Sequence, residues 1–325
     1  DGPLSTNAMS DTFPSWALGP FTRATQEPII SPTDQLVFDC PMLERPVRWA
    51  ENHTFNPAAV TWKGNIHVLF RAEDGQGDEV GQYTSRIGRA VSFDGVSFDV
   101  QPEPVLYPAK DEWIEHEWYG GCQDPRITEL EDGSCAIYYT MFSRDNPVGS
   151  PTNAILGAAS STDLEHWTKH GPIFAEDEAI HDWHKAAGVV QTVRDGRLVA
   201  AKIDGRYWMY WGEASVRIAT STDLLHWTPI RDATGALVEV IAPREGHFDS
   251  RLTEVGPNPV LTEDGIVLIY NGKNDPATGD PAIRPGAYAA GQALFDMNEP
   301  ERVLGRLEMP FLKPELDFET TGQYE

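Results

Sequence analysis

Two seven-residue segments of this chain are nearly identical, and they constrain its fold more than any other feature. They are Ser161-Thr-Asp-Leu-Glu-His-Trp167 and Ser221-Thr-Asp-Leu-Leu-His-Trp227, and Ser92-Phe-Asp-Gly-Val-Ser-Phe98 is a weaker third copy. Each copy follows an apolar, strand-like run and ends on an aromatic residue. Near-identity over seven positions is improbable by chance, so the pattern indicates a repeated supersecondary unit.

Short strand-like runs bounded by Gly, Asp, Asn and Pro fill most of the chain, and helical periodicity is nearly absent. Hairpin turns are predicted between these runs, because type I′ turns need positive φ at both central residues and Asp-Gly pairs tolerate it. The predicted turns are Lys63-Gly64, Glu131-Asp-Gly133, Arg194-Asp-Gly196, Asp204-Gly205 and Glu263-Asp-Gly265.

The repeated unit is therefore strand, hairpin, strand and an outer turn that contains an aspartate. Repeats of roughly 40–50 residues built from four strands are typical of propeller blades. Four blades are predicted to begin near Asn56, Asp124, Lys185 and Asn258, and a fifth would combine the N-terminal region with the segment after about Gly305. The prediction is an all-β fold, a five-bladed β-propeller with a central active-site funnel, in one domain over residues 11–325. Its last blade is short for a complete one, and residues 1–10 have the composition of a tag remnant or a disordered leader.

The charge balance limits the possible partners. Lys and Arg total 25 against 50 Asp and Glu, and the net charge of −25 repels nucleic acid and anionic membranes. No apolar run approaches the roughly 20 residues of a membrane span. Cys40, Cys122 and Cys135 are too scattered for a disulfide framework or a metal site, so we expect reduced thiols in a cytoplasmic protein. No phosphate-binding loop or dinucleotide fingerprint is present, so we expect no cofactor, no metal and a neutral substrate.

The segment Trp118-Tyr-Gly-Gly-Cys-Gln-Asp-Pro-Arg126 places a carboxylate and a guanidinium at the entrance of a predicted strand. Its glycines let the backbone come close to a ligand. Aromatic rings beside carboxylates suit a sugar, which has apolar C–H faces and a rim of hydroxyl groups. A structural pair between Asp124 and Arg126 is the alternative interpretation of the same residues.

Polar residues also begin the first strands of the other predicted blades, where a propeller would bring them together around its axis. Glu213, after an aromatic strand, and Glu254, before the turn Gly256–Pro259, give three acids on three blades together with Asp124. Glycoside hydrolysis needs two acids, and positions across a channel suit the wider, inverting separation of roughly 6.5–9.5 Å. Exposed hairpin residues and polar groups that fill the channel are the alternatives. Among the histidines, His166 and His226 fall in the outer turns and are interpreted as structural, whereas His181, His184 and His247 are candidates to line the site.

From about Phe55 to Glu315 the chain resembles glycoside hydrolase family 130, the five-bladed propellers that are mannoside phosphorylases and β-1,2-mannosidases. The residues that carry the resemblance are Phe55-Asn-Pro-Ala58, Leu69-Phe-Arg-Ala-Glu73, Ser85-Arg-Ile-Gly88, Gly121-Cys-Gln-Asp-Pro-Arg126, Lys185-Ala-Ala187, Phe248-Asp-Ser250, Gly286-Ala-Tyr-Ala-Ala-Gly-Gln-Ala-Leu294 and Val303-Leu-Gly-Arg306. The resemblance implies an inverting reaction in which Asp124 protonates the glycosidic oxygen, directly or through a mannose hydroxyl.

Three departures from the family pattern bear on the reaction. Gln123 replaces the usual Glu, Glu213 stands where the phosphorylases have a His-Arg-Pro element, and Glu254 ends a segment that replaces their Lys-Ile-Gly pattern. Like charges about 4 Å apart cost about 1–4 kcal/mol, so these carboxylates would repel phosphate. Both positions resemble the hydrolase branch of the family, in which acids activate water.

The resulting prediction is an inverting exo-glycosidase that acts on β-mannosides, with β-1,2-linked manno-oligosaccharides as the first choice. Its predicted catalytic residues are Asp124, Glu213 and Glu254. Its predicted substrate-binding residues are Asn56, Arg71, Glu73, Asp74, Tyr119, Gln123, Arg126, Lys185, Tyr210, His247 and Asp249. The alternatives are a phosphorylase, since Arg71, Arg126 and Lys185 would still hold an anion, a non-catalytic sugar-binding propeller, and a furanosidase-type propeller. No interface motif decides whether the chain forms a homo-oligomer.

Overall fold

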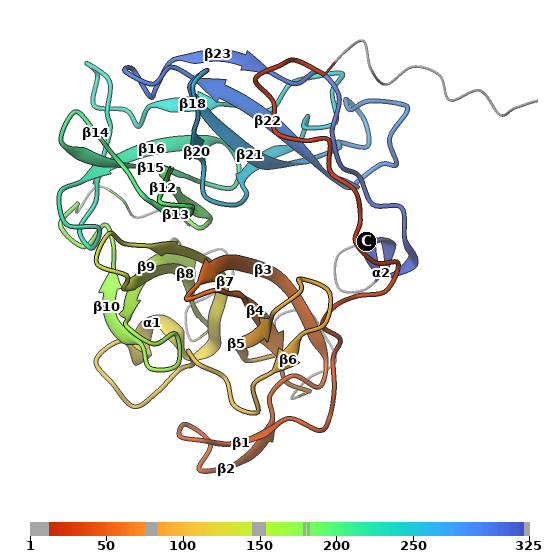
Figure 1. Cartoon of the computed structure of the whole chain (residues 1–325), viewed down its shortest axis with the longest axis vertical. Coiled ribbons are helices and arrows are strands. Elements are labelled where there is room, and N and C mark those ends of the chain that lie inside the picture. Colours follow the sequence, from red (N-terminus) through yellow and green to blue (C-terminus); the bar gives the residue numbers. More distant parts are fainter. Residues whose placement is uncertain (1–12, 76–82, 145–153, 178–179, 181–182, 322–325) are drawn as a thin grey trace, which may run out of the picture.

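The computed structural model describes residues 13–75, 83–144, 154–177, 180 and 183–321. Strands dominate these ranges (Figure 1), and the helices in them are α1 (Ile114–Glu117) and α2 (Asp317–Thr320), each a single turn long. The predicted all-β class is therefore confirmed. The predicted leader over residues 1–10, and His181, lie outside the described residues. None of the helices in the described ranges has the length and apolar character needed to cross a membrane.

The first two groups of strands are antiparallel meanders, in which each strand pairs with the next one along the chain. Group one consists of β3 (His53–Trp62), β4 (Asn65–Glu73), β5 (Ser85–Ser92) and β6 (Asp99–Val100). Group two consists of β7 (Tyr119–Glu129), β8 (Cys135–Ser143), β9 (Ala154–Ser161) and β10 (Thr168–Pro172). Every residue of β8 is buried, as expected for a central strand with apolar side chains on both faces.

The third and fourth groups repeat this order with short additional strands. Group three consists of β11 (Ala187–Val189), β15 (Arg206–Trp211), β16 (Val216–Ser221) and β17 (Thr228–Pro229), with β14 (Lys202–Ile203) and β18 (Glu239–Ile241) at its sides. Group four consists of β19 (Leu252–Val255), β21 (Ile266–Lys273), β22 (Tyr288–Phe295) and β23 (Val303–Arg306), with β20 (Val260–Leu261) beside β21. Group four thus begins at Leu252 rather than near Asn258.

Single parallel pairings connect groups one, two and four into one sheet, group three forms a separate sheet, and the described strands form no closed sheet. The pairings are Ser85 with Gly121, Glu129 with Val199, and Gln191 with Val260. The last two involve the hairpin of β12 (Gln191–Arg194) and β13 (Arg197–Ala200), which lies between groups two and four.

The predicted fifth blade is not formed by the described residues at the two ends of the chain. Over residues 13–50 the strands are β1 (Val37–Cys40) and β2 (Arg45–Arg48), which pair only with each other. At the other end, β23 is already used as the outer strand of group four. The five-bladed arrangement is therefore not confirmed.

The N-terminal segment lies beside the last strands, although the two are far apart in sequence (Figure 1). The backbone N–H and C=O of Leu18 both bond the side-chain amide of Gln292, each at 2.8 Å. Arg23 forms ion pairs with Glu315 at 3.0 Å and with Glu319 at 2.8 Å. These contacts attach the start of the described chain to group four and α2.

The repeated outer turns are confirmed. In the copy over Ser161–Trp167, Oδ1 of Asp163 accepts the backbone N–H groups of Glu165 and His166, and Oγ of Ser161 accepts that of Leu164. The copy over Ser221–Trp227 makes the same bonds with Asp223 and Ser221. Each turn lies between the third and fourth strands of its group.

Among the predicted hairpin turns, three have positive φ at both central residues, as type I′ geometry requires. They are Lys63-Gly64, Asp195-Gly196 and Asp204-Gly205. Local side-chain and turn chemistry therefore fixes where each meander reverses.

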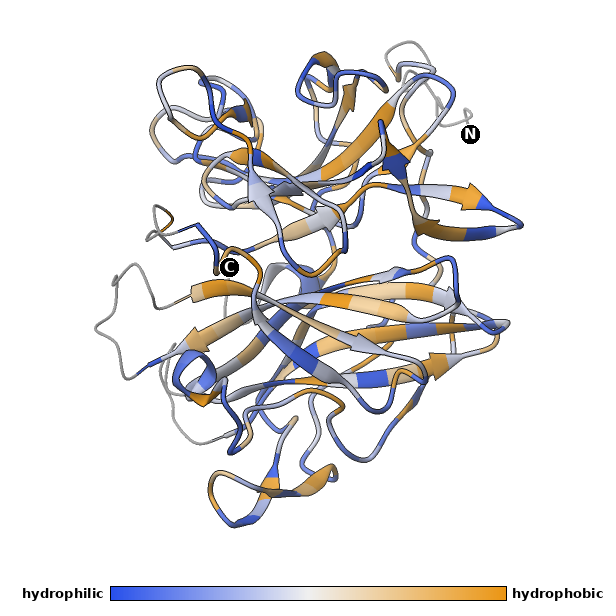
Figure 2. Ribbon diagram, turned by 90° about the vertical axis from the view of Figure 1, so that its left-hand side faces the viewer, coloured by the Kyte–Doolittle hydropathy of each residue, from blue (hydrophilic) through white to orange (hydrophobic). Residues whose placement is uncertain are grey.

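The core consists of apolar layers between neighbouring groups, and the apolar residues concentrate on the strands (Figure 2). Leu69 and Ile87 of group one pack with Ile127 and Ile137 of group two in one cluster. Another cluster connects groups two and three, and a third connects groups three and four. This packing fixes the positions of the first strands, which carry the polar residues of the candidate site.

Candidate functional site

Three polar side chains of the site stand where the backbone of a first strand is interrupted. Asn56 lies in a bulge of β3 and Asp124 in a bulge of β7, with φ of 46° and 50°. Ala186, which follows Lys185 just before β11, has φ of 56°. A left-handed backbone is costly for residues other than glycine, and bulges re-aim side chains. Strained backbone conformations of this kind concentrate at functional sites. Here they accompany polar side chains from three groups that point towards one another.

Asp124 is buried and fully engaged. Its Oδ1 accepts hydrogen bonds from Nδ2 of Asn56 at 2.8 Å and from Arg71 at 3.2 Å, and its Oδ2 lies 3.3 Å from Nζ of Lys185. Burial opposes ionisation of Asp124, but the charges of Lys185 and Arg71 and the bond from Asn56 outweigh it. The pKa of Asp124 is therefore held well below its usual range, and the free protein carries it as a carboxylate.

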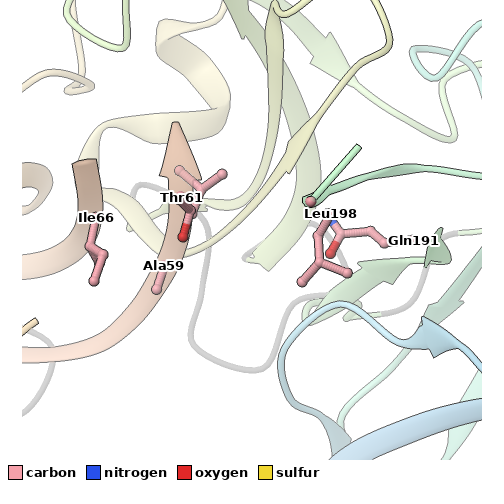
Figure 3. Close-up of a pocket in the computed structure, with 7 residues that line it drawn as sticks. Ala59, Thr61, Ile66, Gln191 and Leu198 are labelled. Atoms are coloured by element: carbon pink, nitrogen blue, oxygen red, sulfur yellow. The ribbon is translucent and has the colours of Figure 1, made fainter. Parts of the chain in front are cut away.

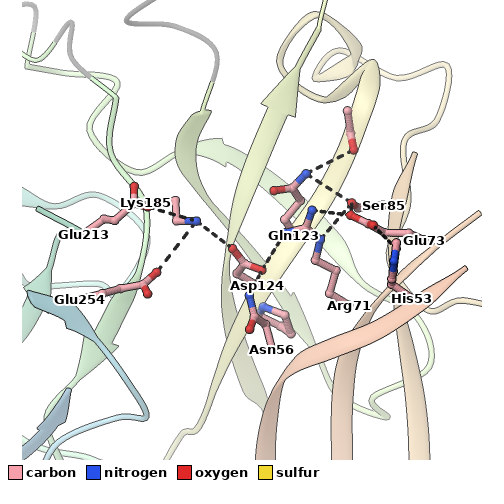
Figure 4. Close-up of polar contacts among 12 residues, drawn as sticks. His53, Asn56, Arg71, Glu73, Ser85, Gln123, Asp124, Lys185, Glu213 and Glu254 are labelled. Carbon is pink, nitrogen blue, oxygen red and sulfur yellow. Dashed lines mark hydrogen bonds and ion pairs between the residues drawn. The ribbon is translucent and has the colours of Figure 1, made fainter. Parts of the chain in front are cut away.

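Lys185 is the centre of the cluster (Figure 4). Its Nζ lies 3.8 Å from Glu213 and 3.9 Å from Glu254, in addition to its contact with Asp124. Burial would lower the pKa of Lys185, but the three carboxylates raise it above its ordinary value. Lys185 is therefore a permanent cation in the midst of three acids.

The two glutamates differ in their surroundings. Glu254, on β19, has a side chain only 15% exposed, and burial raises its pKa, with the charges of Asp124 and Glu213 adding to the effect and Lys185 opposing it. Glu213 follows β15 directly after Gly212, and its side chain is 31% exposed. Its Oε2 accepts a hydrogen bond of 2.9 Å from the indole Nε1 of Trp183. The pKa of Glu254 is thus raised in the same cluster in which that of Asp124 is lowered.

A second set of polar residues supports Arg71. The guanidinium contacts Glu73 at 2.5 Å and Oγ of Ser85 at 3.1 Å. Gln123 reaches the same hydroxyl through its Nε2 at 3.3 Å, and His53 contacts Glu73 at 3.1 Å. Arg71 is thereby held in the orientation in which it donates to Asp124.

Five predicted binding residues lie elsewhere. Asp74, which directly follows β4, is buried against Arg86 at 2.7 Å, because successive residues of an extended chain point to opposite sides. Arg126 donates to the carbonyl groups of Pro125, Val255 and Gly256 instead of to Asp124, so it ties β7 to the residues that follow β19.

The other three lie in group four or in the core around it. Tyr210 donates its hydroxyl to the Pro300 carbonyl at 2.7 Å and belongs to the core. Asp249 is paired with Arg244 and Arg306 and accepts the hydroxyl of Tyr270. His247 contacts Glu308 at the surface.

Two further candidates flank the cluster. Tyr119 is 38% exposed at the start of β7, with its ring against Trp118. His184 precedes Lys185 but packs into the core between Phe174 and Trp211. Its Nδ1 accepts the backbone N–H of Leu156 at 3.1 Å, and burial lowers its pKa from 6.5 to about 4, with Arg217 adding to the effect.

The sequence-based reasoning singled out neither His53, Ser85, Trp183 nor Asn271, which donates to Glu254 at 3.5 Å. Ser85 begins one of the segments that carry the family resemblance, and this position could have identified it as a candidate site residue. Trp183 and Asn271 are brought to the site from outside the first-strand positions that the repeat predicts.

Two cavities lie in this part of the molecule. The larger, of about 510 Å³, reaches the cluster through Asn56 and Asn271, which line it and bond Asp124 and Glu254. The smaller, of about 260 Å³, is lined by Ala59, Thr61 and Ile66 on one side and by Gln191 and Leu198 on the other (Figure 3). None of the three acids lines either cavity.

These residues could hold a polar, uncharged ligand beside an acid and a base. Within the described residues no group of His, Cys, Asp and Glu has the arrangement of a metal site.

The sequence of this chain matches one known family over most of its length. The model of glycoside hydrolase family 130, described as beta-1,4-mannooligosaccharide phosphorylase, matches residues 21–325. The chain belongs to glycoside hydrolase family 130.

Several solved structures of this kind are similar over nearly the whole chain. One, of a putative glycosidase from Bacteroides thetaiotaomicron VPI-5482, is 47% identical with a TM-score of 0.92, covering 96% of this chain and 89% of that chain. Another, 45% identical with a TM-score of 0.92 over 96% of this chain and 86% of that chain, is described as showing that the family of mannoside phosphorylases contains glycoside hydrolases that target β-1,2-mannosidic linkages in Candida mannan.

A relative among characterised proteins is the 1,2-beta-oligomannan phosphorylase of Thermoanaerobacter sp. (strain X514). It is 28% identical over 276 residues, which cover 84% of this chain and 79% of that protein.

Proposed function

We propose that this protein is an inverting, exo-acting hydrolase of β-mannosides, with β-1,2-linked manno-oligosaccharides as its substrates. The observation that carries the proposal is the position of Glu213 and Glu254, which lie within 4 Å of the cation Lys185 and face it together with Asp124. A phosphate ion approaching Lys185 would meet three carboxylates. Each like-charge contact at about 4 Å costs about 1–4 kcal/mol, so water is the favoured nucleophile.

The comparisons support the same choice. The chain is 45% identical to the structure described with glycoside hydrolases that target β-1,2-mannosidic linkages, but 28% identical to the oligomannan phosphorylase. A phosphorylase remains the second candidate, because the named curated relatives have that activity and because Lys185 and Arg71 provide cationic groups.

In the proposed reaction Asp124 donates the proton to the leaving oxygen, directly or through a mannose hydroxyl. A sugar bound between Asp124 and Lys185 would weaken their ion pair and exclude water, and both changes raise the pKa of a carboxyl group. On the other side of Lys185, Glu213 and Glu254 orient and deprotonate the water. The raised pKa of Glu254 makes it a stronger base than an ordinary carboxylate. Asn56, Arg71 and Gln123, supported by Glu73, would surround the terminal sugar.

We also propose that the four groups of strands are blades of a five-bladed propeller that forms a single domain. The repeated outer turns and the convergence of the first strands of three groups support this arrangement. An experimental structure with bound manno-oligosaccharide would test it, and a sugar bound away from Asp124 would contradict the assigned funnel.

The deciding experiment is incubation with β-1,2-mannobiose, with and without inorganic phosphate. Free mannose, formed at a rate independent of phosphate and released first as the α-anomer, is the expected result. Formation of mannose 1-phosphate would show that the protein is a phosphorylase and would refute the hydrolase assignment. No product under either condition, with binding that Glu213→Gln leaves unchanged, would favour a sugar-binding protein.

A further inference from the structure

Trp183 makes a contact with the acidic cluster that the proposed reaction has not yet used. Its indole Nε1 donates to Oε2 of Glu213 at 2.9 Å, while Oε1 of the same carboxylate faces Lys185 at 3.8 Å. The two oxygens of Glu213 therefore have different partners. Because a hydrogen bond to a charged group is directional and strong, the indole fixes which oxygen faces the cluster.

The indole itself has a rigid support. Its ring packs edge-on against Phe142, with centroids 5.6 Å apart, and Phe142 is buried. A Cβ on Gly120 would lie 2.4 Å from a ring atom of Phe142, so the ring occupies space that only glycine leaves open. The guanidinium of Arg144 packs over the same Phe142 ring, 4.6 Å from its centroid. Phe142 thus gives the Trp183 ring a fixed packing partner.

Exposure increases from one end of the cluster to the other. Asp124 is 4% exposed, the Glu213 side chain 31% and Trp183 39%. The indole therefore forms the solvent side of the cluster, next to the carboxylate that is proposed to activate water. The ring bonded to Glu213 thus occupies part of the solvent-facing surround of this carboxylate.

Resting on the proposed hydrolase function, we propose that Trp183 is a positioning residue for Glu213 and the wall that admits water but not larger nucleophiles. In the reaction with water or an alcohol, the bond from the anomeric carbon to the glycosidic oxygen breaks and a bond to the incoming oxygen forms. The nucleophile gives its proton to the base, and the leaving oxygen receives one from the acid. The wall decides which nucleophile enters, and the indole N–H aligns the base.

Two variants separate the two roles. Trp183→Phe keeps the ring and removes the N–H, so kcat on β-1,2-mannobiose should fall about 10- to 100-fold with KM unchanged. In a Glu213→Gln background the same substitution should change kcat less than about twofold, because its effect acts through that carboxylate. Trp183→Ala should in addition raise the ratio of methyl mannoside to mannose formed in dilute methanol, which Trp183→Phe leaves unchanged.

Trp208→Phe is the matched control, because the indole of Trp208 donates to the Ile203 carbonyl away from the cluster, and its activity should be unchanged. Thermal unfolding of each variant excludes a loss of folded protein. Wild-type kcat in Trp183→Phe, or an equal loss in the Glu213→Gln background, would overturn the positioning role, and an unchanged product ratio in Trp183→Ala would overturn the wall. A wild-type protein that releases no free mannose would refute the proposed function itself, a result that these variants cannot produce.

Discussion

The buried imidazole of His184 makes the stability of this protein depend on pH in a way that can be calculated. The pKa of His184 is lowered from 6.5 to about 4, first by burial and then by Arg217. The unfolded chain therefore binds more protons between these values, and the free energy of unfolding falls as the pH drops through this window. At about pH 5 the cost from this one residue is about 2 kcal/mol relative to about pH 7.5.

His184→Asn tests this value. The Asn Oδ1 takes the place of Nδ1, which accepts the Leu156 N–H, so the variant keeps an acceptor and no longer titrates. Urea unfolding followed by tryptophan fluorescence gives the free energy of unfolding at both pH values. The wild-type protein should lose about 2 kcal/mol more than the variant on acidification, whatever the variant loses at neutral pH from poorer packing.

The control is His226→Asn, at an exposed histidine whose pKa is raised by its hydrogen bond to Asp223. A raised folded pKa contributes stability below the unfolded pKa, so this variant should be weakened at acidic pH, which is the opposite sign. If wild type and His184→Asn lose equal stability between the two pH values, then His184 is not held neutral in the folded state and the reasoning is refuted.

Three further substitutions follow from the contacts described. Asp124→Asn should lower kcat about 10²- to 10⁴-fold, the usual contribution of a general acid, with a folded far-UV spectrum, and near wild-type turnover would refute its role. Gly121→Ala should lower the melting temperature, because its φ is +104° and a Cβ would lie 2.1 Å from the Ser85 carbonyl oxygen. Gly133→Ala is its control, since φ is also positive there but no atom lies within 4 Å. Lys169→Met should cost about 3 kcal/mol in chemical denaturation, because it leaves the buried carboxylate of Glu117 without its 2.5 Å partner. Lys110→Met, which removes an exposed pair with Glu44, should be close to neutral.

The parts of this structure that could be predicted from sequence are those set by local chemistry. Asp163 and Asp223 accept backbone N–H groups two and three residues ahead, so a segment of seven residues is enough to determine each outer turn. Asn56, Asp124 and Lys185 converge because each lies within or just before the first strand of its group. That regularity follows from the repeat and needs no knowledge of distant contacts.

The parts that could not be predicted depend on partners from other groups. Asp249 was predicted to bind substrate, but in the structure it forms ion pairs with Arg244 and Arg306. Arg306 is 57 positions away, so the local sequence does not indicate this pairing. Tyr210 lies on the core-facing side of its strand, and its hydroxyl donates a hydrogen bond to the carbonyl of Pro300. The fifth blade is not confirmed, since β23, which was expected to contribute to it, pairs with β22 of group four.

The attachment of Leu18 to Gln292 has a consequence for how the chain is made. The two residues are 274 positions apart, so at about 5–20 residues per second a ribosome needs roughly 14 to 55 seconds to supply the partner of Leu18. Groups one to three can form their meanders during this interval, because their pairings are between neighbours. The N-terminal segment must wait, and it docks only when the last group has been synthesised. The segment around Leu18 is therefore synthesised long before its partner and reaches its folded position late.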